Sequence, residues 1–277
     1  MPEGARQNWD PRVIGVAVLC WGNGVQIPSA RRYGWRKDGG ERRGDRPPWR
    51  KRYHLLRRRE KEMNPEFWKA RWQTNRIGFH QTEINRHLKR FWPRLGLRGE
   101  GRVFVPLCGK SRDLCWLAEE GHEVVGVELA EEAVQAFHEE NGLSCTPCQE
   151  ERFSRWCSDR IEILCGDFFD LTPAHLEGVR AVYDRAALIA LPPDLRKRYI
   201  GHMLRILPKE AKMLLLTLED GPARLPGPPF SVPEGEVEAA FGGRFTIERL
   251  LEGPIHLQGK SGPEAAVTEK VYLLEPK

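Results

Sequence analysis

The chain has 277 residues, of which 40% are hydrophobic and 30% charged, so it can bury one sizeable core or two small ones. No stretch approaches 18 consecutive apolar residues, which excludes a membrane-spanning helix, and we expect no membrane partner. The net charge of +5 comes entirely from the beginning of the chain.

The leading segment, residues 1–62, differs in composition from the rest. It contains 16 Lys/Arg and 7 Asp/Glu, a net charge of +9. Residues 63–277 contain 28 Lys/Arg and 32 Asp/Glu, a net charge of −4. The segment has neither helical nor strand periodicity over a useful length. We expect either a disordered tail with too little apolar surface to fold, or a segment upstream of a true start at Met63. Both interpretations explain Arg57, Arg58 and Arg59 better than a nucleic-acid-binding arm does, so we expect no nucleic-acid partner.

From Met63 onward, the apolar pattern predicts helices and strands in alternation. The first helix begins at Asn64 or Pro65 and carries Phe67, Trp68 and Trp72 along one side. Further helices are predicted over residues 81–92, 111–120, 131–141 and 194–207. Strands are predicted over residues 102–107, 123–129, 161–165, 181–184, 213–218, 245–251 and 268–274.

This alternation predicts an α/β fold with a doubly wound, mostly parallel sheet that is covered by helices on both faces. The last two strands follow each other without an obvious helix, which predicts an antiparallel strand at the C-terminal end. This is the methyltransferase variant of the doubly wound fold. Ligands of such sheets bind at the carboxyl ends of the strands, so the residues directly after each strand are the candidates for a site.

The first strand leads into a loop with one glycine, Gly109, followed by Lys110 and Ser111. A phosphate-binding loop needs a second glycine five residues earlier, where this chain has Phe104, so a nucleoside-triphosphatase is excluded. The dinucleotide fingerprint with three glycines is also absent. Gly109 instead marks a place where the backbone can approach a ligand closely.

Acidic and basic residues end the next three strands. Glu128 lies at the end of the second strand, about 20 residues past the glycine loop, where an acid can accept hydrogen bonds from two ribose hydroxyls. Asp167 and Phe168 follow the third strand and can bind and stack on an adenine, although a plain core role explains Phe168 or Phe169 equally well. Arg185 ends the fourth strand, where a guanidinium can hold a carboxylate or an anionic substrate.

Two of the seven cysteines, Cys145 and Cys148, have the spacing of a redox or zinc pair. No second pair or paired histidines complete a metal site, and the two follow Asn141 and Gly142 in a predicted loop. We therefore expect two loop thiols and no bound metal. An odd number of cysteines at scattered positions argues against disulfides and for a reducing, cytoplasmic location.

From Met63 to the C-terminus, the chain resembles the bacterial thiopurine S-methyltransferase family. The stretches that carry the resemblance lie in order over about 215 residues and are residues 67–72, 78–81, 105–111, 121–128, 184–188 and 226–230. The resemblance implies one methyltransferase domain over residues 63–277, with an N-terminal helical lid at about residues 63–95. The leader has no counterpart in the family, so its role stays open.

The resemblance also implies the residues of the site. The cosubstrate S-adenosylmethionine would be bound by Trp72, Leu107, Glu128 and Arg185, with Asp167 and Phe168 near its adenine. The residues from Trp68 to Phe79 would cover it, Phe79 would face the acceptor, and the turn that ends at Phe230 would form another wall. The family's animal members carry a basic acceptor-contacting residue between Gly253 and Ala265, where only Gln258 or Lys260 aligns here.

The expected activity is methyl transfer to the sulfur of thiopurines or other aromatic thiols, or to selenium or tellurium species, with Arg185 as the catalytic residue. A thiol or selenol ionises near neutral pH, so no dedicated general base is needed, and His80 is expected to be structural. The alternative enzyme is a halide or metalloid-oxyanion methyltransferase of the same fold. A protein that only binds S-adenosylmethionine is the alternative outside catalysis. We expect a monomer that acts on small molecules.

Overall fold

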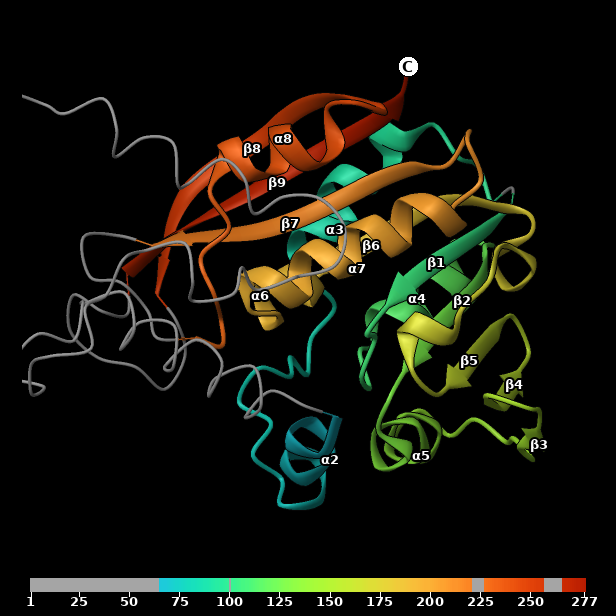
Figure 1. Ribbon diagram of the computed structural model, residues 1–277. Helices are drawn as coiled ribbons and strands as arrows, with labels where there is room; N and C mark the ends of the chain where they lie inside the picture. The colour runs from blue at the N-terminus through green and yellow to red at the C-terminus, as the bar shows by residue number, and fades with distance from the viewer. Residues whose placement is uncertain (1–64, 100, 221–226, 257–265) are drawn as a thin grey trace, which may run out of the picture. The chain divides into compact units, whose positions relative to one another are not determined.

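The structure, a computed structural model, describes residues 65–99, 101–220, 227–256 and 266–277, all within one compact unit of residues 48–277. Nine strands among them form a single sheet with the order β3-β4-β5-β2-β1-β6-β7-β9-β8 (Figure 1). The strands are β1 (Arg102–Pro106), β2 (Glu123–Glu128), β3 (Cys148–Gln149), β4 (Ser154–Ser158), β5 (Ile161–Cys165), β6 (Val179–Arg185), β7 (Lys212–Asp220), β8 (Phe245–His256) and β9 (Ala266–Pro276).

The strands β5, β2, β1, β6 and β7 run parallel to one another in the middle of the sheet. β9 inserts between β7 and β8 and is antiparallel to both. The predicted α/β fold with a mostly parallel sheet and an antiparallel C-terminal strand is therefore confirmed. The carboxyl ends of the five parallel strands lie along the same edge of the sheet, which is the edge expected to bind ligands.

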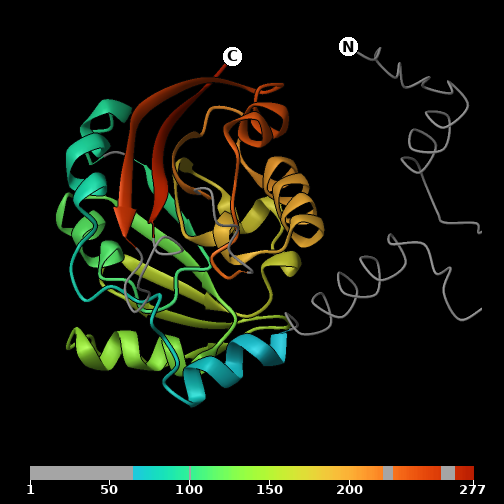
Figure 2. The same cartoon turned by 90° about the vertical axis from the view of Figure 1, so that its left-hand side faces the viewer.

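Helices cover both faces of this sheet. The α-helices are α2 (Pro65–Gln73), α3 (Arg86–Phe91), α4 (Asp113–Glu119), α5 (Glu131–Glu140), α6 (Ala187–Ala190), α7 (Pro193–Ile206) and α8 (Glu234–Phe241), and the 3-10 helices are η3 (Trp92–Leu95), η4 (Phe168–Asp170) and η5 (Pro173–Leu176). Side chains of α3, α4 and α5 pack on one face and those of α6, α7 and α8 on the other. Figure 2 shows the ribbons of α3 and α7 on opposite sides of the sheet. No helix of the described residues has the length and apolar character needed to cross a bilayer.

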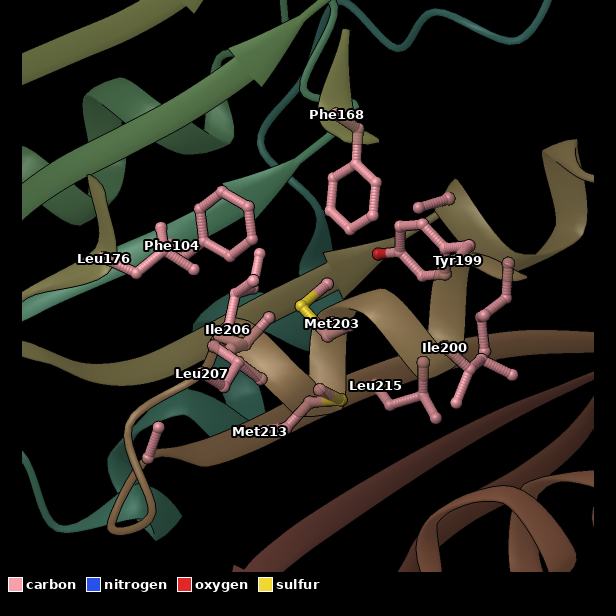
Figure 3. Close-up of a cluster of buried hydrophobic side chains, with 14 of the residues drawn as sticks. Phe104, Phe168, Leu176, Tyr199, Ile200, Met203, Ile206, Leu207, Met213 and Leu215 are labelled. Carbon is pink, nitrogen blue, oxygen red and sulfur yellow. The ribbon is translucent and has the colours of Figure 1, made fainter. Parts of the chain in front are cut away.

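The core on the α7 face shows how the sequence pattern produces this packing (Figure 3). On α7, Tyr199, Met203 and Ile206 are three or four residues apart, so they share one face of the helix. On β7, Met213 and Leu215 are two residues apart and point to the same face of the sheet. All five are nearly inaccessible to solvent, and each such side chain contributes roughly 1.5–3 kcal/mol through burial.

Several boundaries differ from the prediction. The second helix begins at Arg86 rather than at residue 81, because the side chain of Asn85 accepts hydrogen bonds from the backbone N–H groups of His87 and Leu88. α8 and the β3–β4 hairpin were not predicted. β4 alternates in burial but is only five residues long and polar, which leaves little periodic signal.

Two loops at the carboxyl edge contain residues in the left-handed backbone region without being glycine. Leu107 follows β1 with a φ of 49°, and Ala186 follows β6 with a φ of 71°. A side chain in this region costs about 1–3 kcal/mol and persists where the surrounding structure enforces it, most often at functional sites. The strain therefore marks the ends of β1 and β6, next to Gly109, whose φ is 55°.

Candidate active site

A cavity of about 1230 Å³ opens at the carboxyl edge of the sheet. Pockets for one drug-sized ligand usually measure about 300–1,000 Å³, so this cavity has room for a cosubstrate and an acceptor together. It is lined by most of the predicted site residues, which are Trp72, Phe79, Leu107, Gly109, Glu128, Asp167, Phe168 and Arg185. The carboxyl ends of β1, β2, β5 and β6 supply the last six, and the segment before α3 supplies the aromatic side chains.

The glycine loop and the end of β2 are tied together through Glu128. The Glu128 carboxylate accepts hydrogen bonds from the backbone N–H groups of Gly109, at 2.8 Å, and Ala130, at 2.9 Å. Trp72 covers the same loop, because a Cβ at Gly109 would lie 3.0 Å from its indole ring. Any side chain at position 109 would therefore push the indole away, so the loop requires glycine for close packing as well as for its backbone conformation.

Glu128 is a buried carboxylate at the wall of a cavity. Burial raises its pKa, and the backbone N–H groups of Ala130, Gly109 and Leu129 partly oppose this shift because they stabilise the anion. A buried acid in this position gains from further hydrogen-bond donors, such as two adjacent hydroxyl groups of a ribose.

At the end of β5, Asp167 and Phe168 have different surroundings. Asp167 caps η4 by accepting a hydrogen bond from the backbone N–H of Phe169, at 2.9 Å, and it faces the cavity. Phe168 is 6% exposed, and its ring lies 4.6 Å from that of Tyr199, centroid to centroid (Figure 3). Phe168 therefore combines a core position with an edge in the cavity wall, and its stacking on an adenine stays a prediction.

The segment from α2 to α3 brings an aromatic group to the mouth of the cavity. The ring of Phe79 makes edge-to-face contacts with Trp68 and Trp72, at 5.7 and 5.6 Å between centroids. Phe79 is nevertheless 41% exposed. α2 lies beside α5 and is linked to it by a hydrogen bond from Gln73 to Glu132 (Figures 1 and 2).

Arg185 has a partner that the sequence did not reveal. Its Nε lies 3.2 Å from Oδ2 of Asp113, which is buried at the start of α4. The same carboxylate accepts hydrogen bonds from the hydroxyl of Tyr183, at 3.1 Å, and from the backbone N–H of Asn85, at 2.8 Å. Asp113 thus joins the α2–α3 segment, β6 and the guanidinium. Its one sequence signal is an acid in the first turn of a helix, which is too common to indicate this role.

His80 is half-buried in the cavity wall. Burial lowers the pKa of its imidazole, and the positive charges of Lys110 and Arg185 act in the same direction. The imidazole is consequently neutral at pH 7.

One predicted wall residue needs correction. Phe230 is not among the described residues that line the cavity, although its neighbours Pro228 and Pro229 are. Its ring packs back on the chain instead, where a Cβ at Gly227 would collide with it. Gln258 and Lys260, the two residues that align with the basic position of animal relatives, lie outside the described residues.

The cysteines of the described residues are free thiols. Cys108 is fully buried beside the glycine loop, and burial raises its pKa well above the ordinary value. Cys145 lies in a loop, and Cys148 is exposed in the short strand β3. No group of three or more His, Cys, Asp or Glu side chains in the described parts of the chain is arranged to hold a metal ion.

A model of the family described as "Thiopurine S-methyltransferase (TPMT)" matches residues 63–277. The chain belongs to the thiopurine S-methyltransferase family. Two curated relatives named thiopurine S-methyltransferase support the assignment. The protein of Nitrosospira multiformis is 46% identical over 215 residues, covering 76% of this chain and 98% of its own. The protein of Methylococcus capsulatus is 47% identical over 218 residues, covering 76% of this chain and 97% of its own.

Solved structures share the fold of this family member at low sequence identity. The 1,6-didemethyltoxoflavin-N1-methyltransferase of Burkholderia thailandensis, solved with 1,6-didemethyltoxoflavin and S-adenosylhomocysteine, matches with a TM-score of 0.54 and 15% identity, over 82% of this chain and 90% of that chain. An S-adenosylmethionine-dependent methyltransferase of Anabaena variabilis matches with a TM-score of 0.53 and 17% sequence identity. The match covers 77% of this chain and 95% of that chain.

This thiopurine S-methyltransferase family member is therefore an S-adenosylmethionine-dependent methyltransferase. The described residues of the cavity fit that cosubstrate. The cavity wall contains a buried carboxylate, Glu128, and beside it the glycine loop. At Gly109 of this loop, a Cβ would come too close to the indole of Trp72, which lies over the loop. A nucleoside needs both features, an acceptor for its hydroxyl groups and a close backbone approach.

Proposed function

We propose that this methyltransferase transfers the methyl group of S-adenosylmethionine to the sulfur of thiopurines or other aromatic thiols, with selenium and tellurium nucleophiles as further members of the same soft class. The observation that carries the proposal is the guanidinium of Arg185 in the same cavity as Glu128. The Arg185 side chain is only 14% exposed, and its Nε faces Asp113. No described residue accepts a hydrogen bond from its terminal nitrogens, which leaves these donors available to an acceptor.

In this proposal, the end of β2 and the end of β5 bind the nucleoside. Glu128 accepts hydrogen bonds from the ribose hydroxyls, and the backbone at Leu107 and Gly109 lies against the cosubstrate without side chains in between. Asp167 binds the adenine amino group, and Phe168 packs against the ring. Trp72 lies over the sulfonium, where an aromatic face contributes about 0.5–2 kcal/mol of cation–π attraction.

The acceptor is proposed to lie between Arg185, Phe79 and the wall formed by Pro228 and Pro229. A guanidinium in a partly buried site favours the ionised form of a thiol, because an opposite charge lowers the pKa of the group beside it. The flat ring and the two prolines favour flat acceptors. Phe79 and the indoles exclude water when the segment of residues 68–79 lies over the cavity.

When bound, S-adenosylmethionine supplies an electrophilic methyl group on a positively charged sulfur. The protein's contribution is to hold the acceptor sulfur in line with that group, which is worth up to about 7–11 kcal/mol in well-oriented reactions. Arg185 would be the catalytic residue, since it contacts the acceptor and stabilises its negative charge. Arg185 is the last residue of β6, and the next residue, Ala186, has a left-handed backbone conformation with a φ of 71°.

The test compares 6-mercaptopurine and an aryl thiol with a phenol and an aniline of matched shape, between pH 6 and 9. We expect methylation of both thiols and poor methylation of the phenol and aniline, whose protons are held too tightly for this site. Arg185→Lys keeps the positive charge but loses the planar, two-pronged hydrogen bonding of the guanidinium. The lost interaction with the acceptor is worth about 1.5–3 kcal/mol, so turnover of the thiols should fall at least about tenfold. Arg180→Lys, an exposed change on the same strand, is the control.

Faster methylation of the phenol or the aniline than of the thiols would contradict the proposed sulfur specificity, although not the cosubstrate site. A loss in Arg185→Lys no larger than in Arg180→Lys would contradict the bidentate role of Arg185.

A further inference from the structure

A further carboxylate, Glu269, lines the cavity. It is on β9, paired with Leu218 near the carboxyl end of β7, two strands from Arg185 in the sheet (Figure 1). Side chains alternate along a strand, so Glu269 shares a sheet face with Val271. Val271 packs in the same cluster as Tyr183, which shares its face with Arg185. Glu269 and Arg185 therefore stand on the same face and at the same edge of the sheet.

Glu269 is held by a histidine. The Oε2 atom of Glu269 lies 2.7 Å from Nε2 of His87, and the two side chains are 14% and 5% exposed. His87 is fixed by the cap of α3, since its backbone N–H donates to the Asn85 side chain at 2.9 Å. Its Nδ1 is buried and has no hydrogen-bond partner among the described residues. Nε of Arg86 also lies 3.2 Å from Nε2 of His87, so Arg86, His87 and Glu269 form one group of contacts.

Glu269 leaves one carboxylate oxygen free, unlike Glu128 and Asp113, in which both oxygens accept a hydrogen bond. Glu128 is engaged by two backbone N–H groups, and Asp113 by a backbone N–H, a hydroxyl and Arg185. In Glu269, Oε2 is engaged by His87 and lies 3.6 Å from the exposed guanidinium of Arg86. No described residue donates a hydrogen bond to Oε1, so this oxygen can accept a proton from a ligand in the cavity.

We propose that Glu269, oriented by His87, takes the proton of acceptors that enter the cavity as neutral thiols, an inference that rests on the proposed S-methyltransferase function. The lone pair of the acceptor sulfur forms the new S–C bond, and the C–S bond of the sulfonium breaks with its electron pair on the departing sulfur. The S–H proton passes to the Glu269 carboxylate, which becomes a carboxylic acid and later releases the proton to solvent. Positive charge on the sulfonium and negative charge on Glu269 are both consumed, so charge balances.

The charges around Glu269 are consistent with this role. α3 contributes Arg86 and His87, β6 contributes Tyr183 and Arg185, α4 contributes Asp113, and the neighbour of Glu269 on β8 is the uncharged Gly253. Arg185 stabilises negative charge on the acceptor sulfur, and its Nε is paired with Asp113. A guanidinium is always protonated and cannot take up the proton of a neutral thiol, whereas the carboxylate of Glu269 can. Glu269 would be a catalytic residue, and His87 a positioning residue that acts through it.

The test uses two acceptors that differ in their ionisation, an alkyl thiol that is protonated at pH 7 and a nitro-substituted aryl thiol that is already ionised. General-base catalysis is worth about 10²–10⁴-fold. Glu269→Gln should therefore lower kcat/KM for the alkyl thiol at pH 7 at least about tenfold. The loss should shrink as the pH rises and ionises the thiol, while the ionised aryl thiol should keep its rate within about threefold.

Further variants separate catalysis from folding. Glu275→Gln makes the same chemical change on the same strand, where the carboxylate is paired with Lys212 away from the cavity, and it should change neither rate. His87→Phe should reduce the alkyl thiol rate less than Glu269→Gln and leave the aryl thiol rate unchanged. If Glu269→Gln folds poorly, Glu269→Asp can replace it, because aspartate keeps the carboxylate on a side chain that is one methylene shorter. Glu269→Asp should lower kcat/KM for the alkyl thiol less than Glu269→Gln does and leave the aryl thiol rate unchanged.

Equal losses for the two thiols in Glu269→Gln, or no loss for the alkyl thiol, would overturn the inference and leave the proposed function in place. A wild-type protein that methylates neither thiol but methylates a phenol or aniline would overturn the proposed function, and the inference with it.

Discussion

Glu128 is the residue whose role can be tested most directly at the cosubstrate end of the cavity. If it binds both ribose hydroxyls, Glu128→Ala leaves these polar groups unpaired and should weaken S-adenosylhomocysteine binding by roughly 1.5–3 kcal/mol. Burial raises the pKa of Glu128, and the binding form is the carboxylate, so affinity for the wild type should fall as the pH drops through that raised pKa.

Calorimetry with S-adenosylhomocysteine measures both effects. Glu131→Ala, which removes an exposed carboxylate from the first turn of α5, is the control and should bind as the wild type does. Unchanged affinity in Glu128→Ala, or an affinity that rises as the pH falls, would reject the assignment.

The position of Glu128 and Asp167 in the cavity wall could be predicted because strand ends fix it, while their contacts with the cosubstrate stay a prediction. Glu128 is the last residue of β2 and Asp167 lies two residues after β5, and the sheet topology places such positions along one edge. Asp113, His87 and Glu269 could not be predicted, since each reaches the cavity only through tertiary packing of α4, α3 and β9. Nothing in the local sequence distinguishes them from ordinary surface acids or a core histidine.

Among the elements, those with strong β-rich runs were predicted almost to the residue. The prediction for residues 161–165 coincides with β5, and that for residues 123–129 exceeds β2 by one residue. The start of α3 was wrong because Asn85, not the apolar spacing, sets it. α8 was missed since its eight residues carry only two buried side chains, Val237 and Phe241.

The stability of α3 should depend on its N-terminal cap, the side chain of Asn85. Asn85 accepts two backbone hydrogen bonds at the start of a six-residue helix that carries His87 and leads into η3. Asn85→Ala should lower the free energy of unfolding by about 0.5–2 kcal/mol, and Asn85→Ser should restore most of it because serine also caps. Urea denaturation followed by circular dichroism measures the difference. Equal stability of the alanine and serine variants would show that the side-chain cap contributes nothing.

Residues 63–277 can be tested as an independent unit for folding and activity. We propose that they form the complete methyltransferase domain, because the family match covers them and both hydrophobic clusters of the described residues lie within them. A chain that begins at Met63 should fold, keep full activity, and melt within a few degrees of the full chain, since the family match begins at residue 63. Differential scanning calorimetry and thiol turnover provide the comparison. A large loss of activity or of folded protein would show that residues 1–62 contribute to the domain.

The two edges of the sheet are the places where a strand of another copy could pair with this protein. Unpaired strands at a sheet edge are templates for aggregation unless something interrupts them. Among the described strands, β3 ends one side with only two residues, and β8 ends the other with 12. β8 is broken by a bulge after Arg249, contains Pro254, and carries an Arg249–Glu252 ion pair. Neither border offers a long flat run of free N–H and C=O groups, so intermolecular strand pairing is disfavoured even at high protein concentration.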